Sequence, residues 1–242
     1  MRVLYLENGE KEGRQGRNNQ LNMKRILEPE VMDSVEEAIE YDAMDFTEVN
    51  GAFAQEAIAL GSSEQAVVLD AGTGTARIPI LICQMRPNWQ VVAIDLAASM
   101  LQIASSHVHE AGLQDQIRLE LVDVKRMPYK DEQFDIVVSN SLVHHLPDPL
   151  SLFRELKRVL KPNGGIFIRD LFRPYDEVTT DALVGSIGAE YNEHQKKLFR
   201  DSLHAALTIE EVKDLLSEVG LQAVEVYQSS DRHWTAQRRG HW

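Results

Sequence analysis

Two adjacent histidines, His144 and His145, follow the apolar run FDIVVSN at residues 134–140. Imidazole changes its charge near neutral pH, so a histidine after a strand can remove a proton from a substrate or orient it. We predict that His144 does one of these two tasks, while His145 more simply caps the loop. A metal ion held by His144, His145 and Asp148 is a third interpretation. Because Asp148-Pro149 matches a helix N-cap followed by proline at the first helical position, we expect no metal.

Arginine side chains occur at and beyond the end of the apolar run GGIFIRD at residues 164–170. A planar guanidinium group binds carboxylates and phosphates with two parallel hydrogen bonds. We predict that four residues of this region bind the substrate: Arg169, Arg173, Arg200 and His204. These contacts favour an anionic small molecule as the substrate. The alternative is that each arginine pairs with a surface Asp or Glu.

A glycine-rich turn, DAGTGTA at residues 70–76, follows the apolar run AVVLD. Its spacing is G-x-G-x-A, which differs from the dinucleotide fingerprint G-x-G-x-x-G and lacks the Lys-Ser/Thr pair of a phosphate-binding P-loop. Asp95, 21 residues after Gly74, and Asp123 end the next two apolar runs. Carboxylates at such strand ends can accept hydrogen bonds from ribose hydroxyls and an adenine amino group, and Val124 offers an apolar contact. The pattern indicates a nucleoside-containing cofactor.

Short apolar runs alternate with helical segments through the middle of the chain. The expected strands are AVVLDAG (66–72), VVAID (91–95), IRLELVD (117–123), FDIVVSN (134–140) and GGIFIRD (164–170). The expected helices between them begin after Thr75, at about 97 and at 149. Strands that alternate with helices are typical of a parallel sheet. We therefore predict an α/β fold with a doubly wound, mostly parallel sheet.

Helical segments on both sides of this region predict a small cap over the sheet. They are expected from 28, at 47–60, 176–187 and 189–206, before a last helix capped by Thr208 and a final strand hairpin. We predict that residues 1–27 form a mobile N-terminal segment. Residues 28–242 would then form a single domain, with its cap at about 28–61 and 174–207.

The central runs resemble the class I S-adenosylmethionine-dependent methyltransferases, and among them the ubiquinone/menaquinone-methyltransferase-like small-molecule group. The resemblance covers about 65–175 and rests on five motifs: VVLDAGTGTARIPI, VVAIDLAASML, LVDVKRMPY, FDIVVSNSLVHHLPDP and LKPNGGIFIRD. It implies a Rossmann-like methyltransferase fold and S-adenosylmethionine as the cofactor. One departure is Ala76, where the family usually has a third glycine.

The resemblance also implies a role for individual residues. Asp70, Gly72 and Gly74 would line the methionine end of the cofactor, while Asp95 would hold its ribose and Asp123 its adenine. Three further residues complete the expected cofactor site: Leu96, Val124 and Asn140. His144 would point toward the transferred methyl group. Tyr41 would close over the sulfonium, or would be ordinary packing.

Composition limits the partners that we expect. The 25 basic and 38 acidic side chains give a net charge of −13, which repels a nucleic-acid backbone. No apolar run is long enough for a membrane span, and the N-terminus does not match a secretory signal, so we expect a cytoplasmic protein. The lone cysteine, Cys83, lies in the apolar run IPILICQM and predicts an inert, buried thiol.

The expected function is transfer of a methyl group from S-adenosylmethionine to a small molecule by in-line displacement. Such a reaction needs alignment and proton removal, and no covalent enzyme intermediate. Two alternatives stay open. One is an RNA or protein methyltransferase, which the acidic charge disfavours for RNA. The other is a regulatory protein that binds S-adenosylmethionine without turnover. The sequence does not indicate an oligomeric state.

Overall fold

One seven-stranded sheet organises the chain. The computed structural model describes residues 23–28, 33–61, 63–188 and 191–241. Its strands are β1 (Val67–Ala71), β2 (Gln90–Asp95), β3 (Ile117–Leu121), β4 (Phe134–Asn140), β5 (Leu160–Leu171), β6 (Glu225–Gln228) and β7 (His233–Arg238). Their order is β3-β2-β1-β4-β5-β7-β6, with β1 to β5 parallel and β7 antiparallel to both of its neighbours. This confirms the predicted doubly wound, mostly parallel sheet and the final hairpin.

Capping side chains start several of the helices. They are α1 (Val35–Asp42), α2 (Thr47–Ile58), α3 (Arg77–Met85), α4 (Ala98–Glu110), α5 (Pro149–Val159), α6 (Glu177–Ser186), α7 (Glu193–Ala205) and α8 (Ile209–Glu218), with a short 3₁₀ helix η1 (Val143–His145) after β4. Asp148 caps α5 and Thr208 caps α8, as predicted. The first helix begins later than predicted, because a capping box formed by Ser34 and Glu37 starts α1.

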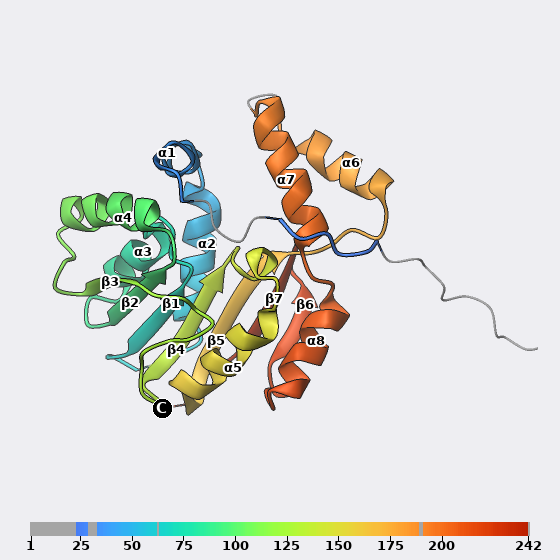
Figure 1. Cartoon of the computed structure of the whole chain (residues 1–242). Helices are drawn as coiled ribbons and strands as arrows, with labels where there is room; N and C mark the ends of the chain where they lie inside the picture. The colour runs from blue at the N-terminus through green and yellow to red at the C-terminus, as the bar shows by residue number, and fades with distance from the viewer. Residues whose placement is uncertain (1–22, 29–32, 62, 189–190, 242) are drawn as a thin grey trace, which may run out of the picture.

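Alternating apolar side chains along each central strand supply the core on both faces of the sheet. In β5, Ile166 and Ile168 pack on the face covered by α5 and α8, while Phe167 points to the face covered by α2, α3 and α4. Figure 1 shows these two helix layers on either side of the sheet. Cys83 lies in the second of these cores, where burial raises the pKa of its thiol to about 12. This thiol is therefore inert at neutral pH.

The remaining helices α1, α6 and α7 lie beyond the carboxyl ends of the parallel strands (Figure 1). Helix α2 is anchored in the sheet layer through Phe53, whose ring meets Phe167 edge to face at 4.8 Å. Residues 23–28 run against the end of α7, where the Ile26 amide donates a hydrogen bond to the carbonyl of His204. Most of the segment expected to be mobile, residues 1–22, lies outside the described residues.

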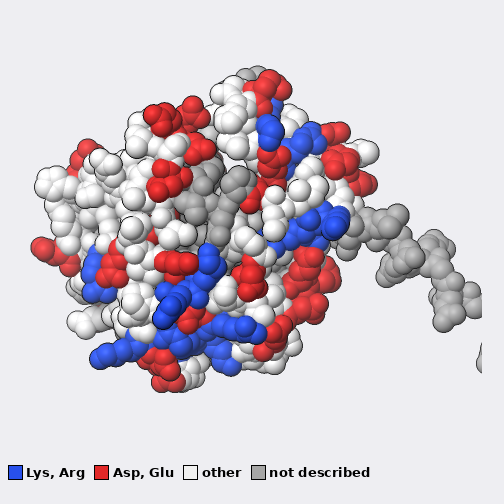
Figure 2. Space-filling view, viewed as in Figure 1, with Lys and Arg blue, Asp and Glu red and all other residues white. Residues whose placement is uncertain are grey.

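The described helices do not reach the length and apolar character that crossing a membrane requires. Acidic and basic side chains are both spread over the surface in Figure 2. On this face, Lys and Arg gather mainly toward the end of the sheet that lies away from α1 and α7.

Candidate functional site

Two adjoining cavities lie at the carboxyl edge of the sheet. The larger has a volume of about 970 Å³ and the smaller about 490 Å³. They share four of the expected site residues: Tyr41, Gly72, Gly74 and Asn140. The strand order reverses between β1 and β4, and doubly wound sheets bind their ligands in the crevice at such a point. The fold therefore places a connected space where a cofactor and a second ligand can lie side by side.

The glycine turn after β1 forms the floor of this space. Gly72 and Gly74 have positive φ values of 75° and 54°, which side chains other than glycine adopt at a cost. A Cβ atom at Gly72 would lie only 2.9 Å from Leu142 Cδ1, so the Leu142 side chain fills the space that a larger residue would need here. Ala76 also has a positive φ, of 61°. Ala76 thus has a left-handed backbone conformation at the position where the family usually has a third glycine.

Asp70, Asp95 and Asp123 lie at the carboxyl ends of neighbouring strands, although β3 ends at Leu121, two residues before the predicted end at Asp123. Asp95 accepts hydrogen bonds from the amides of Gly74 and Ala97, at 2.8 and 2.9 Å, which fix the direction of its carboxylate. Burial raises the pKa of Asp95, while these amides oppose the rise. Asp123 and the buried Val124 line the same cavity. The order of these groups matches the ribose and adenine positions that the resemblance implies.

Asp70 is almost fully buried beside the glycine turn and lines the smaller cavity. Burial raises its pKa to about 7, and the charge of Asp95 adds to the rise. Among the described residues, its Oδ2 atom has no hydrogen-bond partner. An unpaired buried carboxylate is costly unless a donor or cation meets it. Asp70 therefore fits the cationic amino group of S-adenosylmethionine.

Tyr41 lies over the glycine turn from the end of α1. A Cβ atom at Gly74 would lie 3.8 Å from Tyr41 Cε1, and the ring packs against Phe46 with centroids 5.4 Å apart. The next residue, Asp42, pairs with Arg77 at 3.1 Å and with His107 at 3.2 Å. These contacts hold the end of α1 against α3 and α4. Tyr41 thus lies beside the glycine turn, and its closure over the sulfonium stays a prediction.

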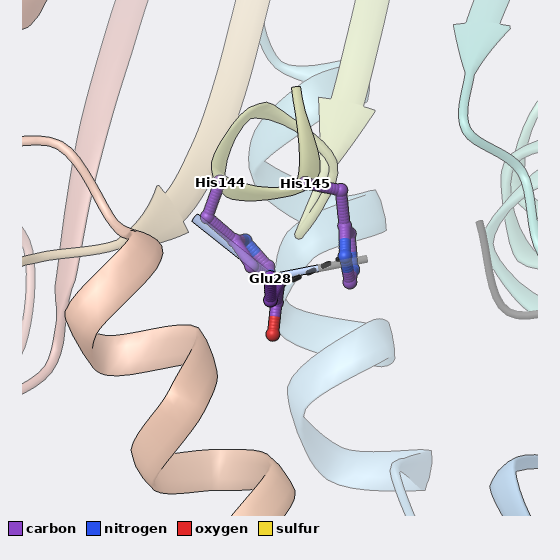
Figure 3. A group of neighbouring side chains, drawn as sticks. All are labelled: Glu28, His144 and His145. Atoms are coloured by element: carbon purple, nitrogen blue, oxygen red, sulfur yellow. Dashed lines mark ion pairs between the residues drawn. The ribbon is translucent and has the colours of Figure 1, made fainter. Parts of the chain in front are cut away.

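A buried cluster closes the other end of the larger cavity. His144 donates or shares a proton with Asp170 through Nδ1, and its Nε2 lies 3.5 Å from Glu28 Oε1. His145 Nδ1 lies 2.9 Å from the same oxygen. Figure 3 shows the two imidazoles leaving η1 side by side and pointing toward Glu28. The side chains of His144 and Glu28 are only 4% and 8% exposed, so this cluster is largely shielded from solvent.

Charge determines the protonation of this cluster. Burial acts to raise the pKa of both carboxyl groups. The effect of the histidines is larger: His144 lowers the pKa of Asp170, and the two histidines lower the pKa of Glu28. The pKa of His144 is raised: burial acts to lower it, but Asp170 outweighs that effect. Arg25 adds a positive charge, and its guanidinium donates to the carbonyls of His144, Leu146 and Ala205. Arg25 thereby ties residues 23–28 to η1 and α7.

The structure corrects most of the expected substrate contacts. Arg173 is buried and donates to the Ala206 carbonyl and to Glu211, so it joins β5 to α8 instead of facing a ligand. Arg200 pairs with Asp181 at 2.5 Å, because its guanidinium crosses from α7 to α6 within the cap. His204 lies 3.4 Å from Glu177. None of Arg173, Arg200 and His204 is among the described residues that line the two cavities.

Arg169 is the one of these four that does line the larger cavity. Its charge is already paired with Glu56 at 2.9 Å, and its Nε donates to Thr235 Oγ1. The guanidinium also lies 5.1 Å from the centre of the Phe167 ring. An anionic ligand would have to compete with Glu56 for it.

Comparison with known proteins agrees with this geometry. A family model described as a methyltransferase domain matches residues 62–235. The chain therefore belongs to this methyltransferase family. It is 32% identical over 111 residues to demethylmenaquinone methyltransferase of Lactobacillus johnsonii, covering 46% of each chain. It is 26% identical to the ubiquinone/menaquinone biosynthesis C-methyltransferase UbiE of Hahella chejuensis, covering 67% of this chain and 69% of that protein.

The fold of this methyltransferase domain also matches a solved structure. The SAM-dependent methyltransferase from Aquifex aeolicus superposes with a TM-score of 0.62 at 20% identity, covering 84% of this chain and 97% of that one. These matches confirm the resemblance seen in the motifs. The match to the L. johnsonii enzyme spans less than half of that protein's length.

Sequence reasoning missed two members of the buried histidine cluster beside the larger cavity. Asp170 ends β5 directly after Arg169, so its place at a strand end was a usable signal for a buried partner of His144. Glu28 lies outside the central motifs, and only the folded chain brings it to η1. His145, expected only to cap the loop, also faces Glu28.

Proposed function

We propose that this protein transfers a methyl group from S-adenosylmethionine to a small-molecule acceptor. The observation that supports this most directly is the arrangement of the expected cofactor residues: all eight line one or both of two adjoining cavities. S-adenosylmethionine supplies a methyl group that is already activated on a sulfonium, so the protein must mainly position the two reactants. A cytoplasmic location and an acceptor other than nucleic acid are part of this proposal.

Each group of residues has its own task in this proposal. The open backbone of Gly72 and Gly74 admits the methionine end, and Asp70 meets its amino group. Asp95 accepts from the ribose hydroxyls with the lone pairs that its two backbone donors leave free. Asp123 and Val124 contact the adenine. Leu96 and Asn140 complete the walls of the cavity at the ends of β2 and β4.

The acceptor would occupy the part of the larger cavity that the cofactor leaves open. Apolar side chains from α2, α7 and the residues on either side of η1 contribute to its walls: Phe53, Leu142, Leu146, Leu198 and Phe199. The buried polar groups at that end are those of Glu28, His144 and His145. We therefore propose an acceptor with an apolar body and one polar group, which is the group that receives the methyl.

A two-step experiment tests this function. Isothermal titration calorimetry with S-adenosylmethionine, S-adenosylhomocysteine and NAD should give binding of the two adenosyl ligands only. Incubation with methyl-labelled S-adenosylmethionine and a metabolite extract should then transfer label to a small molecule, identified by mass spectrometry. Binding of NAD alone would contradict the cofactor assignment, while cofactor binding without any label transfer would favour the regulatory alternative.

A further inference from the structure

We propose that Glu28, His144 and His145 bind a divalent transition-metal ion, such as Zn²⁺, at the acceptor end of the larger cavity. Two imidazoles and one carboxylate are a donor set that suits zinc and related ions, and such a set leaves further coordination positions for a substrate. The three donor atoms all lie within 4.8 Å of one another. Figure 3 shows them converging from η1 and from residues 23–28.

The distances between the donors agree with a shared ion. Two atoms that each lie about 2.1 Å from one metal ion are roughly 3.0–3.4 Å apart, for ligand angles between about 90° and about 109°. Glu28 Oε1 lies 2.9 Å from His145 Nδ1 and 3.5 Å from His144 Nε2. Small side-chain movements therefore suffice to place all three around one ion.

The hydrogen bonding of these atoms is incomplete without a further partner. Glu28 Oε1 and His145 Nδ1 are both buried, and neither has a hydrogen-bond partner of acceptable geometry among the described residues. Their approach to 2.9 Å is thus a close contact without a properly directed hydrogen bond. Buried polar atoms that lack a partner are costly, and an ion bound by both atoms would remove this cost.

A carboxylate behind His144 completes the pattern of a metal-binding histidine. Asp170 contacts His144 Nδ1, which leaves Nε2 to face the cavity cluster. Asp170 is itself held by the amide of Leu171 at 2.6 Å. Metal-bound histidines usually donate their second ring nitrogen to a carboxylate or carbonyl in this way, which fixes the ring and its tautomer.

The charges of the cluster also favour a cation. Glu28 and Asp170 are two carboxylates in a buried group, and Arg25 supplies one positive charge beside them. With neutral histidines the group carries one more negative than positive charge. A proton on His144 is one way to balance it, and a metal ion is the other. A measurement of bound metal distinguishes these alternatives, because only the metal site requires one ion per chain.

This inference rests on the proposed methyl transfer and specifies how the acceptor would be prepared. A hydroxyl group bound to a divalent ion loses its proton to water more readily. The oxygen would keep the electron pair of that O–H bond and use it to form the new bond to the methyl carbon. The bond between this carbon and the sulfonium sulfur would break at the same time, with its electron pair staying on the sulfur of the departing S-adenosylhomocysteine. His144 Nε2 would then donate its lone pair to the ion, so His144 would be a metal ligand instead of the general base.

The test uses the full chain, stripped of metal with a chelator and dialysed. Calorimetric titration with Zn²⁺ should show one ion per chain, and Co²⁺ should give visible absorption bands of a site with nitrogen and oxygen ligands. Glu28→Gln and His145→Asn should each weaken binding more than tenfold. Asp170→Asn should weaken it about 10–100-fold through the ring of His144. The control is His109→Asn, because His109 is exposed on α4 and should leave binding unchanged.

Two results would overturn the site. One is the absence of stoichiometric binding by the unmodified chain, which leaves the proton on His144 as the balancing charge. The other is equal binding by the His109, His145 and Glu28 variants, which shows an adventitious ion only. Glu28→Gln changes a residue outside the helices and strands, so it tests the site even if the buried variants fail to fold. If the unmodified chain binds S-adenosylmethionine and transfers its methyl group but binds no metal ion, this inference alone is contradicted. If it binds one ion per chain but neither binds S-adenosylmethionine nor transfers a methyl group, the proposed function alone is contradicted.

Discussion

The carboxylate of Asp95 accepts a hydrogen bond from the backbone amide of Gly74, with Oδ2 and N 2.8 Å apart. The end of β2 therefore fixes the glycine turn that follows β1. The amides of Gly72 and Thr73 add to this link by donating to the carbonyl of Ile94. One side chain thus shapes the turn and, in the proposed function, also holds the ribose.

We expect Asp95→Ala to weaken binding of S-adenosylmethionine by about 2–3 kcal/mol, because the ribose hydroxyls lose a charged acceptor. The Gly74 amide loses its partner as well, so Asp95→Asn should recover part of the affinity through its remaining carbonyl oxygen. Calorimetry on folded variants measures both effects. Asp115→Ala, which removes an exposed acid from the loop before β3, is the matched control. Unchanged affinity in Asp95→Ala would show that the ribose lies elsewhere.

The raised pKa of Asp70, about 7, predicts that cofactor affinity depends on pH. A cationic ligand favours the ionised carboxylate, so below this pKa binding must first remove a proton from Asp70. Affinity should therefore increase as the pH rises from about 5.5 to about 7.5, and binding should release protons within this window. Titrations in two buffers of different ionisation enthalpy measure the release. Asp70→Asn should bind more weakly and release none, whereas equal proton release in this variant would assign it to another group.

Strands β1, β2, β4 and β5 were predictable because they are largely buried, and a polar or glycine residue lies at or next to the end of each apolar run. The run FDIVVSN coincides with β4, and Asp148-Pro149 begins α5 as expected. The residues expected to hold the cofactor could be predicted for the same reason, since the carboxyl ends of parallel strands lie at one edge of the sheet for any conformation of the loops. The position of each of these residues depends only on the strand that precedes it and on the place of that strand in the sheet.

The acceptor side was less predictable, because its contacts join segments that are distant in sequence. Glu28 reaches His144 through the anchoring of Arg25 on Ala205, and no local pattern at these positions indicates that path. Arg173 has the residue type expected of an anion site but lies in the core, where Glu211 pairs with it. Residue type alone did not distinguish a ligand-binding arginine from one that joins two elements.

Arg173 and Arg200 should therefore differ in their effect on stability. Arg173→Ala leaves the Ala206 carbonyl and Glu211 without their donor, and should lower the free energy of unfolding by roughly 1–3 kcal/mol. Arg200→Ala removes only partly exposed ion pairs and should cost about 0–1 kcal/mol. Urea denaturation compares the two. Equal losses would contradict the structural role assigned to Arg173. A substrate dependence that changes in Arg200→Ala with unchanged stability would restore the anion-binding role predicted from the sequence.

His144→Ala should lower the chemical step while leaving cofactor affinity nearly unchanged. Its ring faces Glu28 and Asp170, and most of the residues expected to hold the cofactor lie at or just after the ends of β1, β2 and β3 instead of β4. Loss of a group that prepares the acceptor typically costs about 10²–10⁴ in rate. Single-turnover transfer of labelled methyl to the acceptor found in the extract measures the step, and calorimetry with S-adenosylhomocysteine measures binding. A comparable loss of S-adenosylhomocysteine binding would mean that His144 supports the cofactor pocket. Full turnover would mean that alignment by the cavity walls is sufficient and that neither a base nor a metal ion at His144 is needed.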